Sequence, residues 1–149
     1  MSDTATKRIA LGADHAGYAL KEALKKSLQG WGIAFEDLGT FDETSTDYPD
    51  YAHKVANGVA AGQYSLGVLV CGTGLGMCIS ANKHKGVRAS TCTDAYAARM
   101  TRLHNDANVL CLGSRIIGQG VAEDILKTFL DTSFEGGRHA ARVAKIEQP

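Results

Sequence analysis

The stretch Leu66-Gly67-Val68-Leu69-Val70-Cys71-Gly72-Thr73-Gly74-Leu75-Gly76 decides the fold of this chain. Its first six residues form an apolar run of strand length. The glycines at alternate positions that follow are typical of a tight turn from a strand into a helix. A strand this apolar does not alternate with polar residues, which indicates that both of its faces are buried. We therefore predict a buried strand of a parallel sheet, followed by a glycine turn and a helix.

Similar apolar runs, separated by helical patterns, occur along the rest of the chain. The runs are Arg8–Ala13, Ile33–Leu38, Val87–Cys92 and Val109–Leu112. Apolar residues at helical spacing form three stripes between them: Leu20, Leu24, Leu28 and Trp31; Tyr51, Val55 and Val59; and Val121, Ile125, Phe129 and Leu130. Gly32 is placed to end the first helix, and Thr93 is expected as the N-cap of a helix over 94–104.

This alternation predicts an α/β protein. We expect residues 1–149 to form a single doubly wound, Rossmann-like domain, because strands without clean alternation need helices on both faces of the sheet. The predicted architecture is a five-stranded parallel sheet with helices on both faces plus a C-terminal helix.

The composition bounds the class of protein. The chain has 149 residues, of which 44% are apolar and 21% are charged, values typical of one globular domain. Its 16 basic and 16 acidic residues cancel, so no overall field attracts nucleic acid or an anionic membrane. Since no apolar run approaches the roughly 20 residues of a membrane span, we expect a soluble, cytoplasmic protein with a small-molecule site.

The loops at the carboxyl ends of the strands define where to search for that site, because ligands of doubly wound sheets bind there. Polar residues and glycines concentrate in three such loops: Asp14-His15-Ala16-Gly17, Asp47-Tyr48-Pro49 and Cys71–Gly76. In the third, backbone N–H groups can converge at the positive end of a helix on an anion or a developing oxyanion. The loop residues assigned to binding are Gly72, Gly74, Leu75 and Gly76. A plain tight turn would show the same spacing.

Cys71 is the candidate catalytic residue of this loop. It ends an apolar strand at a helix N-terminus, where the helix dipole favours a thiolate that can act as base or nucleophile. A buried structural cysteine is the alternative. Cys92 and Cys111 are expected in the core, and no C-x-x-C pairing indicates a zinc or redox motif.

The five histidines show no metal-ligand spacing, so we expect neither a metal nor another cofactor. His53 and His84 are assigned to surface or helical positions without a functional role. His104 ends the helix predicted over 94–104, where a cation is favoured, although a simple helix stop would look the same.

Arg138 and Arg142 are four residues apart and so share one face of the last helix. They can present two guanidinium groups to one phosphate, or form an exposed arginine pair without a ligand.

Other phosphate and nucleotide sites fit less well. A dinucleotide fingerprint belongs on the first strand-to-helix turn, whereas the glycine loop follows the third strand. A cysteine phosphatase loop needs an arginine where this chain has Met77, and no G-x-x-x-x-G-K-[ST] loop occurs. Asp94, at the end of the fourth strand, is similar to the ribose-binding acid of nucleotide folds, which keeps a non-catalytic nucleotide-binding module open.

Seven motifs taken together resemble the ribose-5-phosphate isomerase B family, in an order that spans nearly the whole chain. They are Asp14-His15-Ala16-Gly17, Asp47-Tyr48-Pro49, Cys71-Gly72-Thr73-Gly74-Leu75-Gly76, Ala81-Asn82-Lys83, His104-Asn105-Asp106-Ala107-Asn108, Gly113-Ser114-Arg115 and Glu135-Gly136-Gly137-Arg138-His139. The resemblance implies a metal-independent aldose–ketose isomerase that interconverts ribose 5-phosphate and ribulose 5-phosphate through an enediolate, in the non-oxidative branch of the pentose phosphate pathway.

The resemblance also implies the role of each site residue. Cys71 matches the base that moves a proton between C1 and C2, Thr73 the hydroxyl that helps move a proton between the two oxygens, and His104 the residue that opens the furanose ring. Asp14 and Asn105 match contacts to sugar hydroxyls. The phosphate-binding positions are His15, Arg115, Arg138 and Arg142.

The family further implies a homodimer with active sites shared across a two-fold interface, either alone or as a dimer of dimers. One branch of the family carries a glutamate base directly after the glycine loop, and Met77 at that position places this chain in the cysteine branch. Allose 6-phosphate and galactose 6-phosphate stay open as substrates, because close relatives act on six-carbon sugars.

Overall fold

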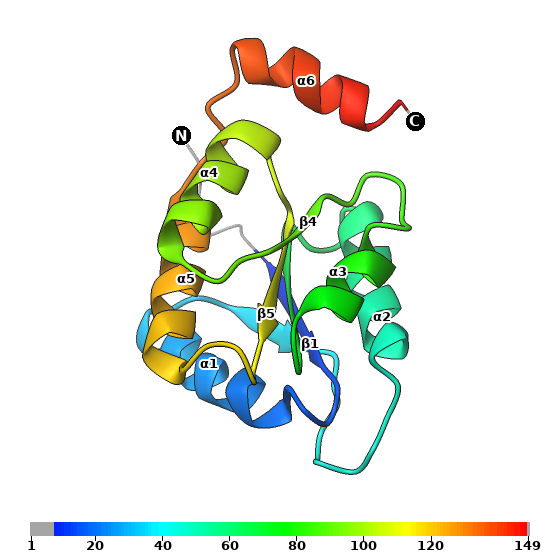
Figure 1. Cartoon of the computed structure of the whole chain (residues 1–149), viewed down its shortest axis with the longest axis vertical. Helices are drawn as coiled ribbons and strands as arrows, with labels where there is room; N and C mark the ends of the chain where they lie inside the picture. The colour runs from blue at the N-terminus through cyan, green and yellow to red at the C-terminus, as the bar shows by residue number, and fades with distance from the viewer. Residues whose placement is uncertain (1–7, 149) are drawn as a thin grey trace.

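Five parallel strands form the centre of residues 8–148, the part of the chain that this computed structural model describes. They are β1 (Ile9–Ala13), β2 (Phe35–Asp37), β3 (Leu66–Cys71), β4 (Ala89–Thr91) and β5 (Val109–Gly113), in the order β2-β1-β3-β5-β4 (Figure 1). The predicted sheet is confirmed. The predicted runs Ile33–Leu38 and Val87–Cys92 form shorter strands, because β2 and β4 lie at the sheet edges, where each pairs with a single neighbour and is half-buried.

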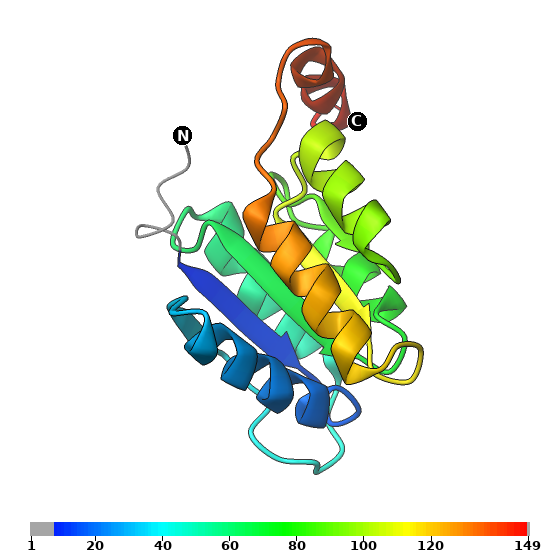
Figure 2. The same ribbon diagram turned by 90° about the vertical axis from the view of Figure 1, so that its left-hand side faces the viewer.

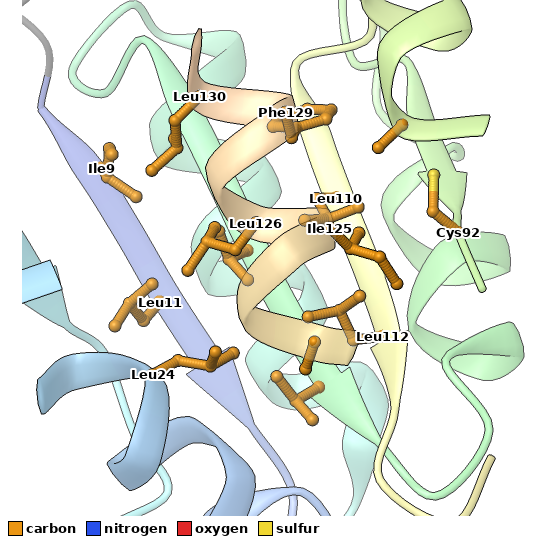
Figure 3. Packing of buried hydrophobic residues seen from close by; sticks show 14 of the residues in the cluster. Ile9, Leu11, Leu24, Cys92, Leu110, Leu112, Ile125, Leu126, Phe129 and Leu130 are labelled. Carbon is orange, nitrogen blue, oxygen red and sulfur yellow. The ribbon is translucent and has the colours of Figure 1, made fainter. Parts of the chain in front are cut away.

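Helices cover both faces of the sheet, as predicted. One face carries α1 (Tyr18–Gly30), α4 (Ala95–Asn105) and α5 (Gln119–Asp131), and the other carries α2 (Tyr48–Ala60) and α3 (Leu75–Ala81) (Figure 1). On the first face, Leu11 of β1 and Leu110 of β5 pack with Leu126 and Phe129 of α5 (Figure 3). No helix of residues 8–148 has the length and apolar character that crossing a membrane requires.

The last helix, α6 (Arg138–Ile146), projects beyond the sheet next to the end of α4 (Figure 2). Only His139 of its nine residues is buried. The other side chains of α6 therefore gain little packing from their own chain.

The start of α4 corrects one prediction. The N-cap is Asp94 and not Thr93, since Asp94 has extended backbone and its side chain accepts a hydrogen bond of 2.7 Å from the Ala97 N–H. A capping side chain serves the N–H two or three residues along, so a helix that begins at Ala95 requires its cap at position 94. The end predicted for α1 is confirmed, because Gly32 follows its C-cap with φ of +71°.

A buried lysine ties α1 to the end of β2. Lys21 is only 1% exposed, and its Nζ lies 2.6 Å from Asp37 and 3.1 Å from Glu22. Lys25 joins this cluster, with its Nζ 2.8 Å from Asp37. Burial works to raise the pKa of Asp37, but the hydrogen bonds from Lys21 and Lys25 hold it below its usual value. Asp37 is therefore the principal counter-charge of a cation that water cannot reach.

Replacing Asp37 tests this arrangement. Asp37→Asn should lower the free energy of unfolding by about 3 kcal/mol in urea titrations, because it leaves a buried ammonium without its closest carboxylate. Glu22→Gln is the matched control and should cost under about 1 kcal/mol, since Glu22 is one-third exposed and its charge interacts mainly through solvent.

The difference between the wild type and Asp37→Asn should also depend on pH. A lowered folded-state pKa adds stability above the ordinary carboxyl pKa, and that contribution disappears as the pH falls through the folded value. The free energies of unfolding of the wild type and Asp37→Asn should therefore converge as the pH is lowered. Equal unfolding midpoints at neutral pH would contradict the role given to Asp37.

Candidate active site

The strand order makes the carboxyl ends of β1 and β3 the switch point of the sheet. From β1 the chain moves outward to β2 at one edge, and from β3 it moves on to β4 at the other, so the connections diverge between these two neighbours. Such a switch point is where doubly wound sheets bind ligands. Asp14 follows β1 there and Cys71 ends β3, which brings the first and third predicted loops side by side.

The two loops are in close contact. A Cβ at Gly17 would lie 2.2 Å from the Val70 carbonyl oxygen, so only glycine allows this approach. The Gly17 N–H donates a hydrogen bond of 3.0 Å to the buried carboxylate of Asp14. The polar end of β1 is thereby held against the strand that carries Cys71.

The glycine loop gives the Cys71 thiol a backbone donor. Gly74 N–H donates to Cys71 Sγ at 3.1 Å, and this contact can stabilise negative charge on the sulfur. Gly74 has φ of +80°, and a Cβ there would lie 2.9 Å from the Leu112 carbonyl carbon, so the position excludes other residues. Thr73 is exposed next to the thiol loop, and its hydroxyl accepts a hydrogen bond of 3.2 Å from the Leu75 N–H.

Two further predicted residues lie at this edge. Arg115 Nη1 would be 3.2 Å from a Cβ at Gly72, so the guanidinium lies over the glycine loop. His15 Nδ1 accepts a hydrogen bond of 3.2 Å from the Thr46 N–H, which connects the first loop to the long loop after β2. The carboxyl ends of the strands, called the carboxyl edge below, thus bring together a thiol, a hydroxyl, a carboxylate, an imidazole and a guanidinium.

Tyr48 lies beside the glycine loop, although nothing in the sequence indicates a role for it. A Cβ at Gly76 would lie 2.5 Å from its ring, so the ring covers the start of α3 beside the glycine loop. The motif Asp47-Tyr48-Pro49 is visible in the sequence, but the sequence does not show that Tyr48 reaches the start of α3.

The remaining predicted residues lie at the other end of the sheet, where the strands begin. His104 and Asn105 end α4, and Arg138 and Arg142 stand exposed on α6, which packs against α4 (Figure 2). Cys71, the last residue of β3, pairs in register with Gly113. Val109, the first residue of β5 and the start of the strand that follows α4, pairs with Gly67. Four strand residues, about 13 Å, separate these pairs. A single chain therefore does not bring His104 to Cys71.

His104 belongs to a cluster that the sequence did not reveal. Its ring stacks on His139 with a centroid distance of 4.2 Å and an interplanar angle of 13°. Glu135 Oε2 lies 3.8 Å from His104 Nε2 and 3.9 Å from His139 Nε2. Burial lowers the pKa of His139, and the nearby His104 lowers it further. The whole of β5 and α5 separates these histidines in sequence, so no local spacing marks the cluster.

Three polar residues lie outside both the glycine-loop group and the His104 cluster: His53, His84 and Asp94. His53 Nδ1 and His84 Nε2 are 2.6 Å apart, joining α2 to the α3–β4 connection, consistent with the structural role predicted for them. The Asp94 carboxylate caps α4, so the proposed ribose contact of a nucleotide module would compete with this cap.

The four cysteines differ sharply in environment. Cys92 and Cys111 are buried, as predicted, and so is Cys71, which is only 4% exposed. Burial raises the pKa of Cys92 to about 11 and that of Cys111 well above its usual value. A hydrogen bond from Cys111 lowers the pKa of half-buried Cys78 to about 6. Cys78 therefore competes with Cys71 as a reactive thiol.

A doubly wound sheet with a thiol and a donor-lined glycine loop at its switch point defines an α/β enzyme for small anionic substrates. The profile of the Ribose/Galactose Isomerase family matches residues 9–146, and the chain belongs to this family. It is 46% identical to ribose-5-phosphate isomerase B of Escherichia coli over 94% of both chains. It is 44% identical to D-erythrulose-4-phosphate isomerase of Pectobacterium atrosepticum, over 93% of this chain and 91% of that one.

The fold agrees with this membership. The structure of a ribose 5-phosphate isomerase from Thermotoga maritima superposes with a TM-score of 0.94 at 48% identity, covering 97% of this chain and 99% of that one. That of ribose-5-phosphate isomerase B from Clostridium thermocellum gives 0.93 at 49% identity, over 95% of both chains.

Alkylation should separate the four thiols. Iodoacetamide should modify Cys71 and Cys78 in the folded protein and leave Cys92 and Cys111 intact, because the raised pKa of the latter two thiols keeps them protonated near neutral pH. Peptide mass spectrometry over time gives each rate. Activity should fall with modification of Cys71 alone, and sugar phosphate should slow that reaction but not the modification of Cys78. Loss of activity that follows Cys78 instead would refute the assignment.

Proposed function

We propose that this protein interconverts D-ribose 5-phosphate and D-ribulose 5-phosphate. The observation that carries the proposal is the Cys71 thiol at the switch point, with the Gly74 N–H 3.1 Å from its sulfur. Membership of the Ribose/Galactose Isomerase family and high identity over nearly the full length of a ribose-5-phosphate isomerase B support the choice of reaction and substrate.

In the proposed mechanism, the Cys71 thiolate removes the C2 proton of the open-chain aldose. The electron pair of that C–H bond forms the C1–C2 double bond of an enediolate, and the thiol then returns the proton to C1. The N–H groups of the glycine loop stabilise the charge that develops on the oxygens, while the exposed Thr73 hydroxyl transfers a proton between O1 and O2. This chemistry needs a base and oxyanion donors and no metal, and activity should survive chelation.

The other predicted residues bind and prepare the sugar phosphate. Asp14 and Asn105 are assigned to its hydroxyls, and His104 to opening the furanose ring. His15 and Arg115 at the carboxyl edge bind the phosphate together with Arg138 and Arg142. Neither arginine of α6 has an ion-pair partner within residues 8–148, which leaves both guanidinium groups available to a dianion.

We further propose a homodimer in which each site joins the carboxyl edge of one chain to His104, Asn105 and α6 of its partner. The support is the separation of the proposed catalytic residues onto opposite edges of one sheet. A two-fold axis uses each surface reciprocally, so one contact would complete two sites. Exposed apolar side chains that a partner could cover include Leu75, Ile79 and Tyr96.

Six-carbon sugar phosphates and the four-carbon substrate named for the P. atrosepticum relative are the alternatives within the same chemistry. Kinetics on ribose 5-phosphate, allose 6-phosphate, galactose 6-phosphate and erythrulose 4-phosphate side by side would test the assignment. The highest kcat/KM should be for ribose 5-phosphate. Binding of NAD or ATP without isomerase activity would instead favour a nucleotide-binding module.

The proposed reaction belongs to the non-oxidative branch of the pentose phosphate pathway, and we assign the protein to the cytoplasm. Four unpaired cysteines suit a reducing compartment.

Cys71→Ser tests the identity of the base. Turnover should fall by at least a thousandfold while substrate affinity changes only a few-fold, because a hydroxyl fits the same space but is far too weak an acid to ionise near neutral pH. Cys78→Ser is the matched control and should keep most of the activity. The assignment of the base is wrong if Cys71→Ser retains a kcat near that of the wild type.

Mixed dimers test the shared site. Cys71→Ala and Arg138→Ala chains, each inactive alone, should recover roughly a quarter of wild-type activity after dissociation and random reassociation. Half of the dimers are then mixed, and each mixed dimer has one intact site, because the two defects fall together in the other. Mixing Cys71→Ala with Thr73→Ala is the control and should restore nothing. Both changes lie in the same glycine loop, so every site of a mixed dimer still carries one of the two defects. Mixed dimers seen by native mass spectrometry that remain inactive would exclude a shared site.

A further inference from the structure

The cluster at the junction of α4 and α6 contains three potential metal ligands. They are His104, Glu135 and His139, one ligand atom from each lying within 4.8 Å of the others. Each comes from a different part of the junction: the last turn of α4, the connection after α5 and the first turn of α6. The Glu135 N–H donates to the Leu103 carbonyl at 3.1 Å, which fixes the connection against α4.

One ligand atom has no partner. His139 is 5% exposed, and its Nε2 is the sole buried side-chain nitrogen or oxygen in residues 8–148 without a hydrogen bond. Burying such an atom unpaired is costly, and most native structures avoid it. The same nitrogen faces Glu135 Oε2 at 3.9 Å, too far for a hydrogen bond.

The separations suit a bridging ion better than direct contacts. Tetrahedral zinc with nitrogen and oxygen ligands at about 2.0–2.1 Å holds neighbouring ligand atoms about 3.3 Å apart. Glu135 Oε2 lies 3.8 and 3.9 Å from the two Nε2 atoms, so these two distances must shorten by about half an ångström. The ligand atoms of the two histidines lie within 4.8 Å of each other and must also move closer together. The stacked histidine rings must also tilt, because each lone pair lies in its ring plane. His104 and Glu135 are about half exposed and can adjust.

The charges at the junction permit a cation. The Glu135 carboxylate supplies a negative charge next to both imidazoles. Arg138 and Arg142 oppose a cation, but both side chains are exposed, where solvent screens them. Two imidazoles and one carboxylate are also a ligand set that zinc uses in sites with an open fourth position.

We propose that His104, Glu135 and His139 form a binding site for a zinc-class divalent cation, and that this ion inhibits the enzyme. The inhibition rests on the proposed role of His104 in ring opening, whereas the binding does not. An ion on Nε2 occupies the lone pair through which His104 would exchange a proton with the sugar. The ion is therefore an inhibitor and not a cofactor.

Binding is tested first, on the chelator-treated full-length protein. Calorimetry with Zn²⁺ and absorption spectra with Co²⁺ should show one ion per chain with nitrogen and oxygen ligands. Glu135→Gln and His139→Gln should each weaken Zn²⁺ binding at least tenfold and abolish the rise in Tm that Zn²⁺ gives the wild type. The double variant His53→Ala/His84→Ala removes the rival surface pair and should bind Zn²⁺ as the wild type does.

A thiolate-to-cobalt charge-transfer band would place the ion on Cys71 or Cys78 and overturn the site. Binding that is unchanged in both Glu135→Gln and His139→Gln would also overturn it.

Inhibition is tested second. Zn²⁺ should inhibit the wild type over the concentration range in which it binds, and a chelator should restore full activity. The activity that Glu135→Gln retains should resist Zn²⁺ at least tenfold better than that of the wild type. Binding with undiminished activity would overturn the inhibition. A chain that binds Zn²⁺ through these residues but isomerises no sugar phosphate would overturn the proposed function and leave the metal site standing.

Discussion

Parallel pairing of the strands is the constraint on which the rest of the structure depends. All strands end on the same side of the sheet, so each helix must carry the chain back to the side where the strands begin before the next strand can start. Residues at the carboxyl ends of strands, such as Asp14 and Cys71, gather at one end of the sheet, and residues at the ends of the returning helices, such as His104 and Asn105, gather at the other. The distribution of functional groups follows from this geometry.

Glycine makes the crowded edge possible. Gly17 lies against the Val70 carbonyl, and Gly74 turns the chain with a positive φ while its Cα faces the Leu112 carbonyl. Gly113, in register with Cys71, has room for a hydrogen only, because a Cβ would lie 2.6 Å from the Thr73 backbone. Three strands can therefore bring their ends together around one thiol. A methyl group at Gly74 or Gly113 would displace the backbone donor that faces the sulfur, and one at Gly17 would push the first loop away from the strand that carries Cys71.

The sequence predicted most of the fold because the signals there are local. The run Leu66–Cys71 forms β3 without any change of bounds, since a fully buried strand is apolar along its entire length. Edge strands were overestimated, because residues such as Ile33 and Val87 extend the apolar pattern past the point where a neighbour offers hydrogen bonds. Thr93 and Asp94 are both good capping residues, and only the backbone decides between them.

The site could be predicted only in part. Cys71 and the glycine loop follow one another along the chain, so a reader of the sequence finds them together. Tyr48 reaches the same loop from a distant segment, and His139 meets His104 only because α6 turns back toward α4. Contacts of this kind depend on tertiary geometry, which neither spacing nor periodicity encodes.

The sparse packing of α6 has a consequence for the proposed dimer. A nine-residue helix is shorter than the roughly 12–15 residues that an isolated helix needs to persist in water, and α6 has one buried side chain to hold it. We expect this segment to fray in a separated chain and to order when a second copy docks. Association would then include a disorder-to-order step, so dilution would unwind the C-terminal arm while the sheet behind it stayed folded.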